Sequence, residues 1–134
     1  MSPIRVVAGI LRDDGGRVLV AERLGDSPFG GLWEFPGGKI AAGESASDAL
    51  RRELAEELGV TALRLEHYMD VEHRYADRHV SIRFFLVTDW HPEPRSLDGQ
   101  ALEWIDPRQT GADSLLPADA PVLEALRGQA RDGS

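Results

Sequence analysis

The sequence predicts an α+β fold in which a mixed β-sheet is sandwiched between α-helices. Several segments rich in Val, Ile and Leu predict strands, and two segments of helix-favouring residues predict amphipathic helices. Because strands flank these helices along the chain, the helices can cover both faces of one sheet. The length of 134 residues suits one domain with its own core, and we expect a single domain over residues 1–134.

Five segments carry the β-branched and aliphatic residues that are typical of strands. The expected strands are residues 4–11, 17–23, 63–69, 80–90 and 102–105. The first two are joined by the turn-forming run Asp-Asp-Gly-Gly at 13–16, which predicts a β-hairpin. A flexible loop over residues 24–31 is placed to shape the mouth of a pocket, and further loops are expected over residues 92–100.

A helix is predicted over residues 46–58, where Ala, Leu, Arg and Glu predominate. Ser45 begins this helix in the manner of a capping box, and Gly59 is the expected left-handed residue at its end. The apolar stripe that would dock the helix consists of Leu50, Leu54 and Leu58. A second helix is expected over about residues 119–127, followed by a loose polar tail over 128–134.

The first predicted helix carries three carboxylates on the arc beside its leucine stripe. They are Glu53, Glu56 and Glu57. At neutral pH, three carboxylates within one turn repel one another, and the only cations on this helix are Arg51 and Arg52. A divalent cation would remove this repulsion, and hard oxygen ligands suit Mg²⁺ or Mn²⁺. Because Mg²⁺ commonly lies between carboxylates and substrate phosphates, the pattern indicates a site for a metal-bound polyphosphate.

The glycine-rich loop and this helix together match the signature of the Nudix hydrolases without a departure. The fixed positions of that signature are Gly38, Glu44, Arg52, Glu53, Leu54, Glu56, Glu57, Gly59 and Val60. The resemblance implies the Nudix fold and Mg²⁺-dependent hydrolysis of a nucleoside diphosphate linked to another group. We therefore expect the glutamate-rich face of this helix to form an active site and not an ordinary solvent-exposed surface.

The resemblance also implies a role for each acidic residue of the helix. Glu56 and Glu57 would bind the metal ion through their carboxylates, and Glu53 would be either a further ligand or the general base. A backbone carbonyl of Gly37 or Gly38 would complete the metal site. Which glutamate acts as the base is left open by the sequence.

Cations and one further carboxylate extend this catalytic set. Arg23 and Lys39 would hold substrate phosphates. Arg52 is expected to pair with Glu44, two helical turns away, and so to orient the cluster. Asp98 has a shorter side chain than a glutamate at this position would have. It could still bind metal or accept a proton from water. Alternatively, Asp98 could cap the following turn.

Outside the signature, the chain resembles one branch of the family, the MutT enzymes, which are 8-oxo-dGTP diphosphatases. The substrate-binding residues that this resemblance implies are Arg23, Glu34, Phe35, Pro36, Gly37, Lys39, Arg78 and Asp119. The implied reaction converts 8-oxo-dGTP to 8-oxo-dGMP and pyrophosphate. Such a reaction removes mutagenic precursors from the nucleotide pool.

Three positions depart from the MutT pattern, and they leave the choice of base open. Pro28 replaces a histidine, Asp98 a glutamate, and Asp119 the asparagine that reads the oxidised guanine. A carboxylate at a helix N-terminus favours its ionised form and then offers acceptors only, which would suit the exocyclic amine of cytosine as well as N7–H of 8-oxoguanine. One alternative function is therefore hydrolysis of CTP or 5-substituted dCTP. The other alternative is that Asp119 contacts no base and only caps the helix that follows it.

Composition excludes several other classes of protein. The chain has 23 acidic and 15 basic residues, and the net charge of −8 argues against a nucleic-acid partner. It has no cysteine, and no apolar run approaches the roughly 20 residues of a membrane span. We expect a cytoplasmic monomer that binds a small nucleoside triphosphate and no membrane. A nucleotide sensor without hydrolysis is disfavoured, because such domains commonly lose glutamates that this chain keeps.

Overall fold

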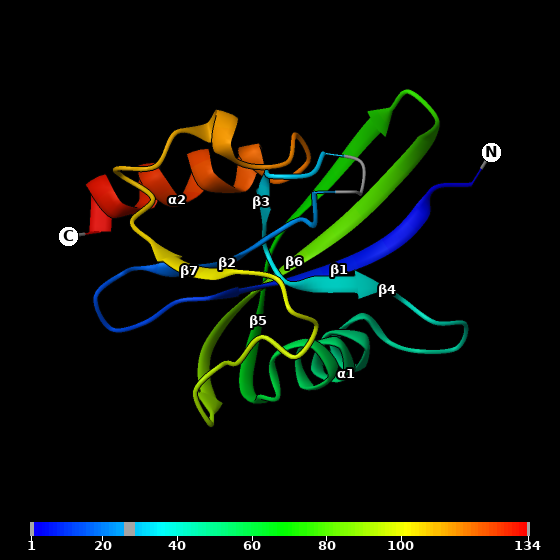
Figure 1. Ribbon diagram of the computed structural model, residues 1–134, viewed down its shortest axis with the longest axis horizontal. Helices are drawn as coiled ribbons and strands as arrows, with labels where there is room; N and C mark the ends of the chain where they lie inside the picture. The colour runs from blue at the N-terminus through cyan, green and yellow to red at the C-terminus, as the bar shows by residue number, and fades with distance from the viewer. Residues whose placement is uncertain (1, 26–28, 134) are drawn as a thin grey trace.

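The computed structural model describes residues 2–25 and 29–133, and its elements follow the chain in the order shown in Figure 1. The strands are β1 (Ile4–Leu11), β2 (Val18–Glu22), β3 (Trp33–Glu34), β4 (Gly37–Lys39), β5 (Thr61–Tyr75), β6 (Arg78–His91) and β7 (Leu102–Ile105). The helices are α1 (Ala46–Leu58), the short 3-10 helix η1 (Ala112–Ser114) and α2 (Ala120–Gly133). None of the described helices is both long enough and apolar enough to cross a membrane.

The strands form two sheets. The larger sheet has the order β4-β1-β6-β5 and is mixed, because β1 runs parallel to β6 and antiparallel to β4. The smaller sheet has the order β3-β2-β7, and its neighbouring strands are antiparallel. In the parallel pair, Ile4 lies opposite Val80 and Leu11 lies opposite Val87. On its other edge, β1 pairs with β4 through Val6, Val7 and Ala8.

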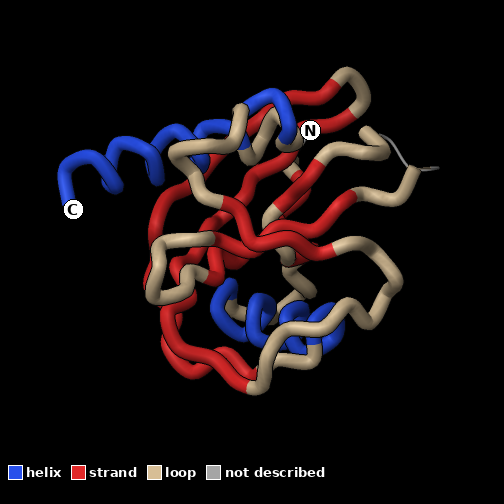
Figure 2. The backbone as a smooth tube through the Cα atoms, turned by 60° about the vertical axis from the view of Figure 1, so that its left-hand side comes forward, coloured by secondary structure: helices blue, strands red, loops and turns tan. Residues whose placement is uncertain are grey.

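The helices lie on opposite sides of the strands, as Figures 1 and 2 show, which confirms the predicted mixed sheet sandwiched between helices. On one side, the buried face of α1 packs against β1 and β6 through residues such as Val7, Phe85 and Val87. On the other side, α2 packs through Val122, Leu123 and Leu126 onto alternating strand residues that include Ile10, Phe84 and Leu86. The two-residue alternation of β1 thus supplies both core clusters.

Helix α1 begins and ends as the sequence predicts. The hydroxyl of Ser45 accepts a hydrogen bond from the backbone N–H of Asp48 at 3.1 Å, and Gly59 ends the helix with φ of 67°. The predicted stripe of Leu50, Leu54 and Leu58 is fully buried. This burial holds α1 against the sheet and turns its adjoining glutamate face toward β4.

The predicted hairpin between the first two strands is wrong. Both strands exist, but β1 and β2 belong to different sheets, and a single bridge between Arg12 and Val18 joins their ends. The turn itself is well formed, because the side chain of Asp13 accepts bonds from the N–H groups of Gly15 and Arg17, each at 2.9 Å. β6 pairs along one edge of β1 and β4 pairs with Val6, Val7 and Ala8 on the other, whereas β2 pairs with β3 and β7 in the second sheet.

Other elements are longer than predicted. β5 and β6 form an extended antiparallel pair from Thr61 to His91, and the short strands β3 and β4 lie in a stretch for which no strand was predicted. Helix α2 continues to Gly133, past the predicted end near residue 127 and through most of the tail expected to be loose. The hydroxyl of Tyr68 on β5 donates to the Gln129 side chain at 3.1 Å, which attaches this extension to the sheet. Ser134 and Pro28 lie outside the described residues.

Candidate active site

Glu53 lies where α1 meets β4. Its carboxylate is packed so closely against Gly38 that a methyl group on Gly38 would overlap it. Only 15% of the Glu53 side chain is exposed, and Arg52 donates to Glu53 Oε1 at 2.8 Å. The absence of a side chain at Gly38 therefore allows this close approach.

Glu57 lies beside Glu53 and is also partly buried. Burial raises the pKa of Glu57 to about 8, the neighbouring carboxylates of Glu53 and Glu34 add to the rise, and the backbone N–H of Gly37 opposes it. The site therefore brings together carboxylates whose negative charges are unfavourable in a partly dehydrated environment. A cation at this position would relieve that cost.

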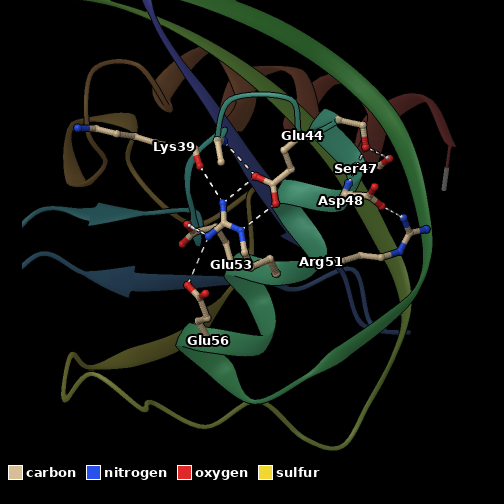
Figure 3. A network of polar contacts seen from close by, with 10 residues as sticks. Lys39, Glu44, Ser47, Asp48, Arg51, Glu53 and Glu56 are labelled. Carbon is tan, nitrogen blue, oxygen red and sulfur yellow. Dashed lines mark hydrogen bonds and ion pairs between the residues drawn. The ribbon is translucent and has the colours of Figure 1, made fainter.

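Arg52 and Glu44 pair as the sequence predicts. Arg52 Nε donates to Glu44 Oε2 at 2.8 Å and Arg52 Nη2 to Glu44 Oε1 at 2.9 Å, in the two-pronged geometry that guanidinium and carboxylate favour. Hydrogen bonds from Arg52 and from the Ala41 N–H lower the pKa of Glu44 to about 2. Arg52 also donates to the carbonyl of Lys39 at 3.1 Å. The guanidinium thus ties the glycine-rich loop to Glu53 (Figure 3).

Glu56 is placed differently from the other two glutamates. Its side chain is 59% exposed and lies 3.5 Å from Arg52 Nη1, on the same side of α1 as Glu53 (Figure 3). Among residues 2–25 and 29–133, no three acidic, histidine or cysteine side chains are arranged to hold a metal ion by themselves. The metal-binding role of Glu56 stays a prediction.

The donor atoms fit a divalent cation in their chemistry. Glu53 and Glu57 offer hard oxygen ligands in a place where burial disfavours two negative charges. Asp98 adds a third carboxylate at the rim of the adjoining pocket. Backbone carbonyls, water and substrate phosphates are the further ligands that Mg²⁺ commonly uses. Gly37 and Gly38 lie next to Glu57 and Glu53 in space, so their carbonyls are candidates for such ligands.

The loop after β6 docks on the end of α1 and carries Asp98 to this site. The N–H groups of Arg95 and Leu97 donate to the carbonyls of Leu58 and Glu57, each at 3.0 Å. These carbonyls belong to the last turn of the helix, which has no partners of its own for them. As a result, Asp98 lines a pocket of about 240 Å³ together with Glu57, Glu34, Arg23 and Pro36.

A second cavity of about 290 Å³ opens over β1 and β4. It is lined by most of the predicted substrate-binding residues, namely Arg23, Glu34, Phe35, Gly37, Lys39, Arg78 and Asp119. Alternate residues of β1, Ile4, Val6 and Ala8, form an apolar wall. The ion pair between Arg23 Nη1 and Glu34 Oε2, 3.0 Å long, borders both this cavity and the pocket of Asp98. Arg23 therefore lies between the acidic site and the cavity.

Asp119 is the buried polar residue of this cavity, only 5% exposed. Its Oδ2 accepts a hydrogen bond of 3.1 Å from the N–H of Phe35, 84 positions away in the chain. Burial raises the pKa of Asp119 to about 8; the Phe35 N–H and Arg23 oppose this rise and Glu34 adds to it. The expectation that a helix N-terminus keeps Asp119 ionised is therefore wrong, because dehydration outweighs the favourable dipole.

The remaining predicted residues have mixed surroundings. The ring of Phe35 packs edge-on against Phe84 in the core, so Phe35 faces the cavity mainly as backbone. Arg78 lies over the ring of Tyr75 at 5.5 Å, and its buried Nε has no hydrogen-bond partner among the described residues. Tyr75 and Phe29 also line the cavity, and Phe29 was not among the predicted site residues. A single aromatic residue in a loop does not indicate, from sequence alone, that its side chain will line a cavity.

Comparison with known proteins agrees with this arrangement. The NUDIX domain family matches residues 2–126. The 8-oxo-dGTP diphosphatase of Escherichia coli K12 is 35% identical over 127 residues, which are 95% of this chain and 98% of the relative. The CTP pyrophosphohydrolase of the same organism is 40% identical over 126 residues, 94% of this chain and 93% of the relative.

A solved MutT Nudix hydrolase from Burkholderia pseudomallei has the same fold. It superimposes with a TM-score of 0.84 at 29% sequence identity, and the match covers 92% of this chain and 98% of that one. The family match spans both the glycine-rich loop and α1, which carry the carboxylates described above. The chain therefore belongs to the NUDIX domain family.

Proposed function

We propose that this protein hydrolyses 8-oxo-dGTP to 8-oxo-dGMP and pyrophosphate, with Mg²⁺ as the metal ion and Mn²⁺ as a substitute. The feature that supports this function is the meeting of two pockets at the Arg23–Glu34 ion pair. One pocket holds carboxylates suited to a metal-bound polyphosphate, and the other has the apolar walls and single buried polar group that suit a base. A relative that is 35% identical to this chain is named 8-oxo-dGTP diphosphatase.

In this proposal the chain's own residues orient the polyphosphate and move the proton. Bound Mg²⁺ would neutralise phosphate charge and lower the pKa of water, with Glu53, Glu57 and Asp98 as candidate ligands. Arg23 binds phosphate oxygens at the junction of the two pockets. A carboxylate of the cluster accepts the proton of the water that attacks phosphorus, and pyrophosphate leaves as the P–O bond breaks. Arg52 keeps Glu53 oriented while this happens.

The protonated form of Asp119 supports an oxidised guanine as the base. A neutral carboxyl group offers one O–H donor and remaining acceptor capacity, which is the pattern an asparagine amide offers. Such a group can donate to O6 and accept from N7–H of 8-oxoguanine. Because the pKa of Asp119 is about 8, this form prevails at neutral pH. Aspartate can therefore serve where the MutT pattern has asparagine.

Hydrolysis of CTP or 5-substituted dCTP is the second candidate. It is favoured by the 40% identity to a CTP pyrophosphohydrolase and by the aspartate itself, since an acceptor suits the exocyclic amine of cytosine. The catalytic helix would act in the same way for either base. We propose the cytoplasm as the place of action and the monomer as the active form.

The test is pyrophosphate release by the purified protein with Mg²⁺, comparing the kcat/KM values for 8-oxo-dGTP, dGTP, 5-methyl-dCTP and CTP. We expect 8-oxo-dGTP to be preferred, and a preference for a cytosine nucleotide would instead support the second candidate. Glu53→Gln is the variant for the site, and Asp48→Asn is its matched control, because Asp48 is an exposed carboxylate of the same helix. Equal turnover by the wild-type protein and Glu53→Gln would contradict the assignment of the site.

A further inference from the structure

Phe29 has an unusual conformation for a large residue. Its φ is 62°, in the left-handed region that side chains other than Asn and Asp rarely adopt, and its side chain is left 41% exposed. A strained backbone around a half-exposed aromatic is unfavourable on both counts, since neither the strain nor the exposed apolar surface helps the fold. Such residues persist where their surroundings hold them and where they have a function.

The surrounding loop holds Phe29 in place. The carbonyl of Phe29 accepts a hydrogen bond from the N–H of Leu32 at 3.1 Å. At the base of the loop, the N–H of Arg23 donates to the Leu32 carbonyl at 2.9 Å, and Gly31 donates to the Arg23 carbonyl at 3.1 Å. Gly30 lies so close to the backbone of Gly25 that a side chain there would overlap it. The loop is thus closed by backbone contacts that do not depend on the ring of Phe29.

The ring of Phe29 faces the cavity together with Tyr75. The two ring centres are 5.2 Å apart, with an angle of 55° between the planes. The hydroxyl of Tyr75 in turn accepts a bond of 3.3 Å from the N–H of Ala118, next to Asp119. Phe29 and Asp119 therefore line one cavity, the first as an accessible aromatic surface and the second as its buried polar group.

We propose that Phe29 packs against the base of the bound nucleotide and so sets the affinity of the enzyme for substrates that carry a base. The inference rests on the proposed function and adds to it a contact that the signature does not contain. Base–aromatic contacts contribute to affinity without reading hydrogen bonds, so Phe29 would add affinity for any base while Asp119 selects among bases. The ring would also shield the hydrogen bonds of Asp119 from water.

The direct test is the affinity of Phe29→Ala for two ligands, measured by titration calorimetry in the presence of Mg²⁺. For 8-oxo-dGMP, which carries a base, we expect Kd to rise about tenfold or more. For tripolyphosphate, which has none, we expect Kd to stay unchanged. Phe29→Trp, which restores an aromatic surface, should bind 8-oxo-dGMP as the wild-type protein does. In turnover, Phe29→Ala should raise KM for 8-oxo-dGTP while leaving kcat within about twofold.

Controls separate a ligand contact from a role in folding. Leu63→Ala truncates another exposed apolar side chain, 52% exposed and outside the lining of the cavity, and should change neither Kd. Phe29→Gly relieves the backbone strain, so its loss of 8-oxo-dGMP affinity should come without a loss of thermal stability. Equal weakening of both ligands in Phe29→Ala, or unchanged binding of 8-oxo-dGMP, would overturn the inference.

The calorimetric result does not depend on turnover, which keeps the two proposals distinguishable. If the wild-type protein releases no pyrophosphate from the nucleotides above but binds 8-oxo-dGMP through Phe29, the proposed function fails and the base contact stands. If the protein hydrolyses 8-oxo-dGTP and Phe29→Ala does so with unchanged KM and Kd, only the base contact fails. If no nucleoside monophosphate binds to the wild-type protein at all, the base contact is overturned as well.

Discussion

Replacing the buried Asp119 by asparagine should change how the stability of the protein depends on pH. The folded state raises the pKa of this carboxyl group from its ordinary value of 3.8 to about 8. Between these two values the folded chain keeps a proton that the unfolded chain has lost. The stabilising contribution of Asp119 is therefore complete below about pH 4 and is lost as the pH rises through about 8. An asparagine side chain cannot ionise, so Asp119→Asn removes this dependence.

The size of the effect follows from the linkage between proton binding and folding. One proton bound only by the folded state changes the free energy of unfolding by about 1.4 kcal/mol for each pH unit. From pH 5 to pH 7, Asp119→Asn should thus gain about 2–3 kcal/mol relative to the wild-type protein. The amide oxygen can still accept from the Phe35 N–H, so the variant keeps the hydrogen bond seen here at 3.1 Å.

The assay is urea denaturation of both proteins at intervals from pH 5 to pH 9, without Mg²⁺. Asp113→Asn serves as the matched control, because Asp113 is an aspartate of η1, near the same end of α2. We expect the free energy of unfolding of Asp113→Asn to vary with pH in the same way as that of the wild-type protein. For Asp119→Asn, we expect it to rise relative to the wild-type value as the pH increases. Parallel curves for Asp119→Asn would refute the conclusion that burial keeps Asp119 protonated, and with it the donor role toward 8-oxoguanine.

Three other perturbations test the acidic site and its support. Glu57→Gln should lower kcat by about 10²-fold or more with unchanged circular dichroism, as expected for a lost metal ligand or base; a near-normal kcat would remove Glu57 from the site. Mg²⁺ should raise the midpoint of thermal unfolding of the wild-type protein, EDTA should reverse this, and Glu57→Gln should show a much smaller rise. Leu54→Ala, which truncates a fully buried residue of α1, should cost about 2–5 kcal/mol in the free energy of unfolding by urea; a cost below about 1 kcal/mol would show that α1 docks differently.

Local features of the chain are where sequence and structure agree most closely. The helix α1 begins after Ser45 and ends at Gly59 as expected, because capping bonds and left-handed ends depend on neighbours within one turn. The pairing of Arg52 with Glu44 was predicted as well, although Glu44 lies just before the N-cap Ser45 and reaches Arg52 from the preceding turn. The leucine stripe is buried as its spacing indicates. The signature also identifies the glutamates, although the side chain of Glu56 is 59% exposed.

Features that depend on distant partners were not predictable. The turn at residues 13–16 has the local chemistry of a hairpin, but β1 pairs with β4 and β6 while β2 pairs with β3 and β7, and these partners come from elsewhere in the chain. Asp98 reaches the acidic pocket only because the loop N–H groups find the unpartnered carbonyls at the end of α1.

The protonation of Asp119 and the placement of Phe29 show most clearly what the two levels decide. By itself the sequence determined the helix α1, the carboxylates that it carries and the family, because these depend on residue types at fixed short spacings. Only the tertiary structure decided that Asp119 is buried and accepts a hydrogen bond from the N–H of Phe35. It likewise decided that Phe29 lines the same cavity as Tyr75. The physical reason is that burial and electrostatic environment arise from segments far apart in the chain, and no local pattern encodes them.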